Sequence, residues 1–226
     1  MPIPDDWCYV NNFSNERKPK LIRLPPGRGS TFRQAITELI SRFASDIPRT
    51  FESVEFLHER DRLVADLKKT QETEFIQLQQ HVEMFNFIIL RTASGFALAP
   101  AVDGKPVPPE ELARLTTEQR VKLSEIEHAL GEKVQSTINR FKELEKTTFQ
   151  KLQELVSRTV QFIISPLIQP IRQEFSDHPQ VNAYIDALQQ DLVANLSQFH
   201  PPSQGEEQPR PSPADQEKWR QRYEVN

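Results

Sequence analysis

Proline is the residue that most limits what this chain can fold into. The sequence of 226 residues contains 18 prolines, and they leave two long stretches free, residues 49–99 and 110–165. A proline inside a helix costs about 3 kcal/mol, because it removes a backbone donor and its ring clashes with the preceding turn. Long helices are therefore expected in these two stretches and shorter elements elsewhere.

Both proline-free stretches carry apolar residues at the spacing of a helix. These positions recur mostly three, four or seven residues apart, with Glu, Lys, Arg and Gln between them, which is typical of a narrow apolar stripe on a charged helix. The first stretch predicts a helix from about Pro48 to Phe85. The second predicts a helix over 116–165, and Pro166 and Pro170 are expected to break or kink it.

The narrow stripes predict that the two helices pair as an antiparallel coiled-coil arm over residues 48–165. Gln71 occupies a seam position, so the coiled coil is expected to be irregular. Residues 86–92 and 96–100 are β-branched and aromatic on either side of a short turn, which predicts a β-hairpin. This hairpin belongs to a tip segment, 86–116, that joins the two helices.

Shorter elements complete the predicted fold. A tight turn at Asp103-Gly104 precedes a short helix that starts near Pro109. Apolar periodicity predicts two further helices, 31–47 and 181–199, near the base of the arm. The predicted fold class is mainly α: an elongated helical domain with a long coiled-coil arm, a small β-hairpin at its tip and short strands at both termini.

The sequence pattern predicts strands at the two ends of the chain. Residues 6–13 and 20–24 are short apolar runs, and residues 219–226 resemble the beginning of another strand. Isolated strands leave backbone groups unpaired and an apolar face unfilled. Either both ends are frayed tails, or the chain is cut from a larger protein whose sheet both ends enter.

Composition excludes several classes of protein. The hydrophobic share, 37%, is low for a globular domain with a thick core. The single Cys8 excludes a disulfide framework, and without a Cys/His cluster a zinc module is excluded as well. No apolar run approaches the roughly 20 residues of a membrane span, so no membrane partner and a cytoplasmic location are expected. No catalytic, cofactor-binding or metal-ligating residue is expected in this chain.

Several segments together resemble one branch of the Lon-type proteases. They are DWCYVNNF at 6–13, PPGRG at 25–29, GFALAPAVDGKPVPPEELARLTTEQR at 95–120, and the terminal RYEVN. In that branch a long helical insertion interrupts an AAA-type module, and a serine–lysine protease domain follows. The resemblance implies four parts: a core strand segment over 1–29, a helical insertion domain over 30–199, a proline-rich linker or disordered segment over 200–215, and the start of a further core strand over 216–226.

The resemblance also implies a function, the handling or gating of unfolded polypeptide substrates for a ring-shaped, homohexameric protease. The catalytic serine and lysine of that protease would lie outside this chain. Gly27-Arg28-Gly29-Ser30 has too few residues between its glycines, and no lysine, to form a phosphate-binding loop. ATP and magnesium would therefore belong to the parent protein alone, and some relatives work without ATP. The alternative is a free-standing coiled-coil adaptor or chaperone-like binding module.

Two groups of residues are candidates for contact with partners. The first is the apolar set of the hairpin, which either packs on the helix ends or touches substrate or a neighbouring subunit; it consists of Phe87, Ile89, Phe96 and Leu98. The second is a basic set that could contact phosphates or other subunits; it consists of Arg17, Lys18, Lys20, Arg23 and Arg28. The net charge of −4 does not favour nucleic acid as the partner.

Overall fold

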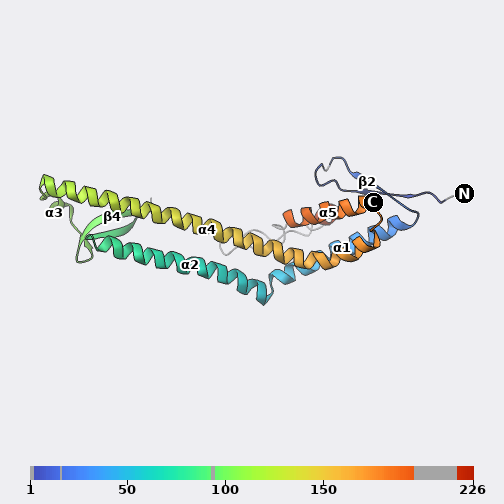
Figure 1. The fold of residues 1–226 in the computed structure, drawn as a ribbon, viewed down its shortest axis with the longest axis horizontal. Helices are drawn as coiled ribbons and strands as arrows, with labels where there is room; N and C mark the ends of the chain where they lie inside the picture. The colour runs from blue at the N-terminus through green and yellow to red at the C-terminus, as the bar shows by residue number, and fades with distance from the viewer. Residues whose placement is uncertain (1–2, 16, 93–94, 196–217) are drawn as a thin grey trace. The chain divides into compact units, whose positions relative to one another are not determined.

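The computed structural model describes residues 3–15, 17–92, 95–195 and 218–226. The described chain is mainly helical, as the sequence predicts, and it divides into two compact units (Figure 1). Unit 1 combines residues 1–59 with 153–226, and unit 2 is the intervening segment 60–152. The predicted linker at 200–215 and the end of the predicted helix 181–199 lie outside the described residues.

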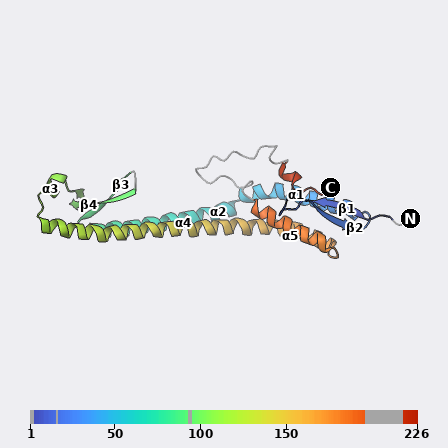
Figure 2. The ribbon, with the colours of Figure 1, turned by 90° about the horizontal axis from the view of Figure 1, so that it is seen from above.

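Unit 1 holds a two-stranded antiparallel sheet under helices. Strands β1 (Asp6–Val10) and β2 (Lys20–Leu24) pair with Asp6 opposite Leu24, which confirms both predicted N-terminal strands. Helix α1 (Arg28–Phe51) follows directly, and helix α5 (Pro179–Ala194) comes near the end of the chain. Figure 2 shows the sheet from a second direction, with α1 and α5 close to it.

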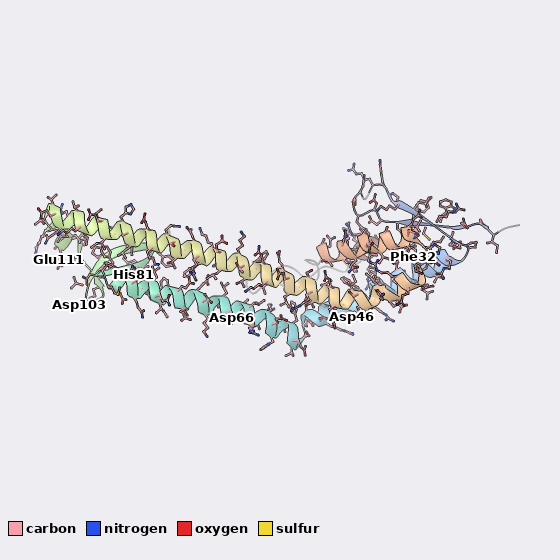
Figure 3. All side chains as sticks on the ribbon, viewed as in Figure 1. Phe32, Asp46, Asp66, His81, Asp103 and Glu111 are labelled. Atoms are coloured by element: carbon pink, nitrogen blue, oxygen red, sulfur yellow. The ribbon has the colours of Figure 1, made fainter. Side chains whose placement is uncertain are left out.

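The core of unit 1 comes from one face of each of these elements. Phe32 of α1 is fully buried, and its ring stands edge-on to those of Phe175 and Tyr184, at centroid distances of 5.4 and 5.9 Å (Figure 3). The side chains that point from the sheet toward this core are buried too; they are Cys8, Val10, Ile22 and Leu24. The alternation of inward and outward side chains along a strand explains why their neighbours are exposed.

Two helix boundaries predicted from proline are wrong, while a kink at Pro166 and Pro170 stays a prediction. Helix α1 runs through Pro48 to Phe51, and helix α4 (Thr117–Glu174) runs through Pro166 and Pro170. Both prolines of α4 are exposed and lie four residues apart, on one side of the helix. The carbonyl groups that lose their donors there can therefore be hydrated, which lowers the cost of each proline.

The break between the first two helices falls at Glu52–Ser53 instead. Helix α2 (Val54–Glu83) starts with Ser53 Oγ accepting a hydrogen bond from the backbone N–H of Phe56, at 3.3 Å. The rings of Phe51 and Phe56 meet edge-on across the break, 4.9 Å apart. A serine cap and this aromatic contact, rather than proline, decide where α1 ends.

In unit 2, parts of α2 and α4 lie side by side and antiparallel (Figure 1). Gln71 Nε2 donates to Glu145 Oε1 at 3.0 Å, and Arg140 Nε lies 2.7 Å from Glu74 Oε1. These polar pairs occupy the middle of the helix pair, as the polar seam position at Gln71 predicts. Helix α4 begins with a reciprocal cap, in which Thr116 and Gln119 each bond the other's backbone N–H, at 3.3 and 2.9 Å.

A small antiparallel sheet joins the two helices. It contains β3 (Phe87–Thr92), β4 (Gly95–Val102) and β5 (Lys105–Pro106), in that order, and the short helix α3 (Pro109–Ala113) follows. The predicted hairpin, the turn at Asp103-Gly104 and the short helix are therefore confirmed. Asn86, with φ of 61°, reverses the chain after α2, and its carbonyl accepts the Ala101 N–H at 2.7 Å.

Gly29 brings the start of α1 unusually close to β1. Its backbone N–H donates to Asp6 Oδ2 at 2.7 Å, so a carboxylate from the strand caps the helix. A Cβ atom at position 29 would lie 2.9 Å from Asp6 Cβ and 3.1 Å from Cys8 Sγ. The second glycine of the PPGRG segment is thus required by packing between helix and strand.

We expect Gly29→Ala to lower the free energy of unfolding by about 1–3 kcal/mol, because β1 must move away and the Asp6 cap is lost. Gly131→Ala is the matched control. Gly131 lies in α4 with open space around its Cβ position, so alanine there should stabilise the chain by about 0.5–1 kcal/mol. Urea unfolding of both variants checks the pair; equal effects would contradict the close approach as the reason for Gly29.

Candidate functional site

Most of the apolar residues predicted as tip contacts lie inside unit 2. Phe87 is 1% exposed and belongs to a buried cluster with α2 and α4; the cluster consists of Leu78, Val82, Phe87, Leu130 and Val134. Ile89 and Leu98 pack against this cluster, and the ring of Phe96 lies 5.7 Å from that of Phe75. Phe87, Ile89 and Leu98 attach the sheet to the helix pair, whereas Phe96 is 37% exposed. Contact with a partner stays a prediction for all four.

Besides Leu90 and Phe96, three residues outside the predicted set are apolar and exposed at this end of unit 2. Met84 is 73% exposed, Val102 63% and Phe85 43%, and all three lie next to the backbone bond between Asn86 and Ala101. Sequence reasoning missed them because Phe85 continues the helical period of α2. Helix α2 ends at Glu83, and the ring of Phe85 leans on that of His81, 5.3 Å away (Figure 3 labels His81).

The predicted basic residues differ in exposure and in their partners. Arg17, Lys18 and Lys20 are exposed on the β1–β2 hairpin. Arg23 forms an ion pair with Asp5, and its guanidinium lies 5.8 Å from the centre of the Trp7 ring.

Arg28 is held inside unit 1. It donates to the Glu174 carboxylate at 3.1 Å and to the Glu174 backbone carbonyl at 2.8 Å. Its guanidinium also covers the Phe175 ring at 4.6 Å. Arg28 therefore ties the start of α1 to the end of α4, where a cation is favoured by the helix dipole.

The outer face of the β1–β2 sheet is apolar and exposed. Trp7 is 56% exposed, Tyr9 54% and Leu21 43%, and the strand register places all three on the face opposite the core. On its other edge, β1 meets the C-terminal residue. The Tyr9 N–H donates to the Asn226 carbonyl at 2.6 Å, and the Asn226 N–H donates to the Tyr9 carbonyl at 3.0 Å.

This contact modifies the prediction for the C-terminal segment. Residues 218–221 form one helical turn rather than a strand, and Asn226 is the residue that pairs with β1. The N-terminal and C-terminal segments thus meet through the two backbone bonds between Tyr9 and Asn226, and the two alternatives for the chain ends, frayed tails or parts of a larger sheet, stay predictions.

A polar centre that sequence reasoning did not find lies between α5 and this segment. The Asp191 carboxylate accepts hydrogen bonds from Arg222 Nε at 2.9 Å, Arg222 Nη2 at 2.7 Å and Tyr223 Oη at 2.7 Å. The residues are about thirty positions apart, and no local pattern connects them. Tertiary packing alone brings them together.

The electrostatics of this centre follow from its burial and its hydrogen bonds. Burial acts to raise the pKa of Asp191, but the bonds from Arg222 and Tyr223 and the charge of Arg222 outweigh it, so the pKa lies below its ordinary value. Burial, together with the nearby Asp191 charge, raises the pKa of Tyr184 and of Tyr223. The carboxylate is therefore ionised and both phenols are protonated at neutral pH.

Among the described residues, no group of three or more His, Cys, Asp or Glu side chains is placed to hold a metal ion. Cys8 is buried, and burial followed by the Asp6 charge raises the pKa of its thiol, which makes it a packing residue rather than a nucleophile. No helix in the described part of the chain has the length and apolar character needed to cross a membrane.

Comparison with known proteins gives one family. No curated protein matches the chain. Residues 6–39 match the family model described as the Lon-like LonC helical domain. This segment spans β1, β2 and the first half of α1, and includes Asp6, Arg28 and Gly29, whose contacts join helix and strand. Over residues 6–39, the chain thus matches the LonC helical domain of Lon-like proteins, which confirms there the family resemblance predicted from the sequence.

Proposed function

We propose that this chain is the helical domain of a Lon-like serine protease, and that it handles unfolded polypeptide substrates for the proteolytic part of that enzyme. The observation that carries the proposal is the match of residues 6–39 to the Lon-like LonC helical domain. The domain's contribution is mechanical and adhesive, and the chemistry of peptide cleavage belongs to the parent protein.

The arrangement of unit 1 supports insertion into a larger core. Tyr9 and Asn226 exchange two backbone hydrogen bonds, so the C-terminal segment reaches the free edge of β1. The outer face of this sheet exposes Trp7, Tyr9 and Leu21, whose burial under further elements would be favourable. We propose that residues 1–29 and 216–226 lie where the helical domain joins the AAA-type core of the parent, because the family match covers 6–29 together with the start of α1.

The apolar surface of unit 2 supports substrate handling. Met84, Phe85 and Val102 are exposed together beside the β3–β5 sheet. Unfolded polypeptides expose apolar side chains, and a methionine adapts to many shapes of partner. In this proposal the parent is a cytoplasmic, homohexameric ring, and its catalytic residues, and ATP and magnesium where it uses them, lie outside this chain.

The proposal is tested by removing unit 2 from the parent enzyme. Glu59 and Arg158 form an ion pair with a 2.7 Å contact, so a short linker can join residues 59 and 153 when 60–152 are deleted. We expect degradation of an unfolded protein such as casein to fall at least about tenfold. Cleavage of a short fluorogenic peptide, which needs no handling, should stay within about twofold.

Gel filtration must show that the deleted enzyme keeps its assembly state. Undiminished degradation of casein would overturn the substrate-handling role. Loss of both activities with intact assembly would also contradict it, because the domain would then act on the active site rather than on the substrate.

A further inference from the structure

The C-terminal segment, residues 218–226, packs on the rest of unit 1 through three buried side chains, Trp219, Tyr223 and Val225, and the Trp219 ring stacks on Phe43 of α1 at 6.1 Å. It also makes two hydrogen-bonded attachments. One attachment is polar, between Asp191 on α5 and the pair Arg222 and Tyr223. The other is the backbone pairing of Asn226 with Tyr9 of β1. Only two residues separate Tyr223 from Asn226, so the first attachment positions the second.

Aromatic rings surround the polar attachment. The ring of Phe13, which follows β1, lies 5.8 Å from Tyr184 and 5.7 Å from Tyr223. Trp219 meets Tyr223 edge-on at 5.0 Å, and the Arg222 guanidinium lies 5.7 Å from the Phe13 ring. Asp191 is thus the acidic centre of a contact that includes α5, the segment after β1 and the C-terminal segment.

The Asp191 carboxylate is the element of this contact that is hardest to replace. Its side chain is 9% exposed, and a charge that is buried to this extent needs strong hydrogen bonds to remain ionised. Three donated bonds, two of them from one guanidinium, meet that need. An amide in place of the carboxylate would keep one acceptor oxygen of the two, so its NH2 group would face either Arg222 Nη2 or the two donors that share Oδ2, Arg222 Nε and Tyr223 Oη.

The cost of losing the carboxylate falls on the segment rather than on the whole unit. Arg222 is 26% exposed and can be hydrated when the segment leaves. Phe32 contacts Phe175 and Tyr184 directly, and none of these three rings belongs to residues 218–226. We therefore expect loss of the carboxylate to act first on the segment, through local opening.

We propose that Asp191 is a clasp, a conformational device that couples docking of residues 218–226 on α5 to the pairing of Asn226 with Tyr9. While Asp191 holds Arg222 and Tyr223, α5 fixes the position at which Asn226 pairs with Tyr9 of β1. When the clasp opens, the segment leaves α5 and β1 together. The clasp belongs to the chain itself and does not depend on the assignment to a Lon-like protease.

Amide hydrogen exchange of the 226-residue chain, followed by NMR, tests the clasp. The reporter is the Tyr9 amide, which donates to Asn226. The internal control is the Val10 amide: because antiparallel neighbours alternate, Val10 pairs toward Lys20 of β2 and not toward Asn226. In Asp191→Asn, the Tyr9 amide should exchange about tenfold faster or more, the effect expected when a hydrogen bond to a charged group is lost. The Val10 amide should stay within about twofold.

Two further variants make the result decisive. Asp186→Asn removes another α5 carboxylate, which pairs with Arg172 at 2.5 Å but is 58% exposed, and it should leave Tyr9 exchange unchanged. Tyr223→Phe removes one of the three bonds and keeps the ring, so it should speed Tyr9 exchange by a smaller factor in the same direction. If Asp191→Asn does not fold, Tyr223→Phe decides the question alone.

Wild-type exchange at Tyr9 in both variants would overturn the coupling. Equal acceleration at Tyr9 and Val10 would overturn it as well, because Asp191 would then support the whole hairpin. Neither result bears on protease function, so failure of the clasp is distinct from failure of the proposed function.

Discussion

Phe87→Ala is expected to lower the free energy of unfolding of unit 2 by about 3–5 kcal/mol. Phe87 is 1% exposed and lies between α2 and α4, in a cluster with Val82 and Leu130. Truncation would leave a cavity, because α2, α4 and the sheet cannot all move inward to fill the space of the lost ring. Urea unfolding, followed by amide exchange within residues 60–152, measures the loss.

Met84→Ala is the control, because this residue is 73% exposed in the same unit. Its effect on stability should stay within about 0.5 kcal/mol. The comparison separates the two interpretations of the hairpin residues. A Phe87 that mainly contacts a partner would leave unfolding unchanged when truncated, and that result would contradict the packing role.

Phe32→Ala should destabilise unit 1 by a similar amount, about 3–5 kcal/mol. The ring is fully buried and makes edge-on contacts with Phe175 and Tyr184, which connect α1 to the end of α4 and to α5. Aromatic pairs of this kind add to the loss of buried area. The amides of Cys8 and Val10 should lose protection, because the sheet rests on this core.

Phe162→Ala provides the comparison for Phe32. Phe162 belongs to the same unit and is 81% exposed, so its truncation should change stability by less than about 0.5 kcal/mol. A loss at Phe162 as large as that at Phe32 would mean that the exposed face of α4 is packed in solution.

Local patterns predicted most elements of the fold. The hairpin at β3 and β4, the turn at Asp103-Gly104, the cap at Thr116 and the N-terminal strands all follow from residues a few positions apart. Proline was a weaker guide than expected. Pro48, Pro166 and Pro170 lie within helices, because the cost of proline falls where the freed carbonyl can be hydrated and neighbouring turns remain packed.

Residues with functional potential were harder to predict. Phe87, Ile89 and Leu98 look like contact residues in the sequence, because a two-stranded hairpin cannot bury them by itself. The helix pair buries Phe87 and partly covers the other two, and the end of α2 at Glu83 exposes Met84 and Phe85 instead. Apolar character shows that a side chain needs cover, but it does not show which surface provides it.

The sequence by itself determined the mainly helical class, the positions of the two long helices and the family to which residues 6–39 are related. These depend on periodicity and on short motifs, which act over a few residues. Only the tertiary structure decided that Arg28 binds the end of α4, that Asp191 holds Arg222 and Tyr223, and that Asn226 pairs with Tyr9. Such contacts join residues far apart in the chain, and their free energy depends on burial and geometry that arise only when the whole unit has packed.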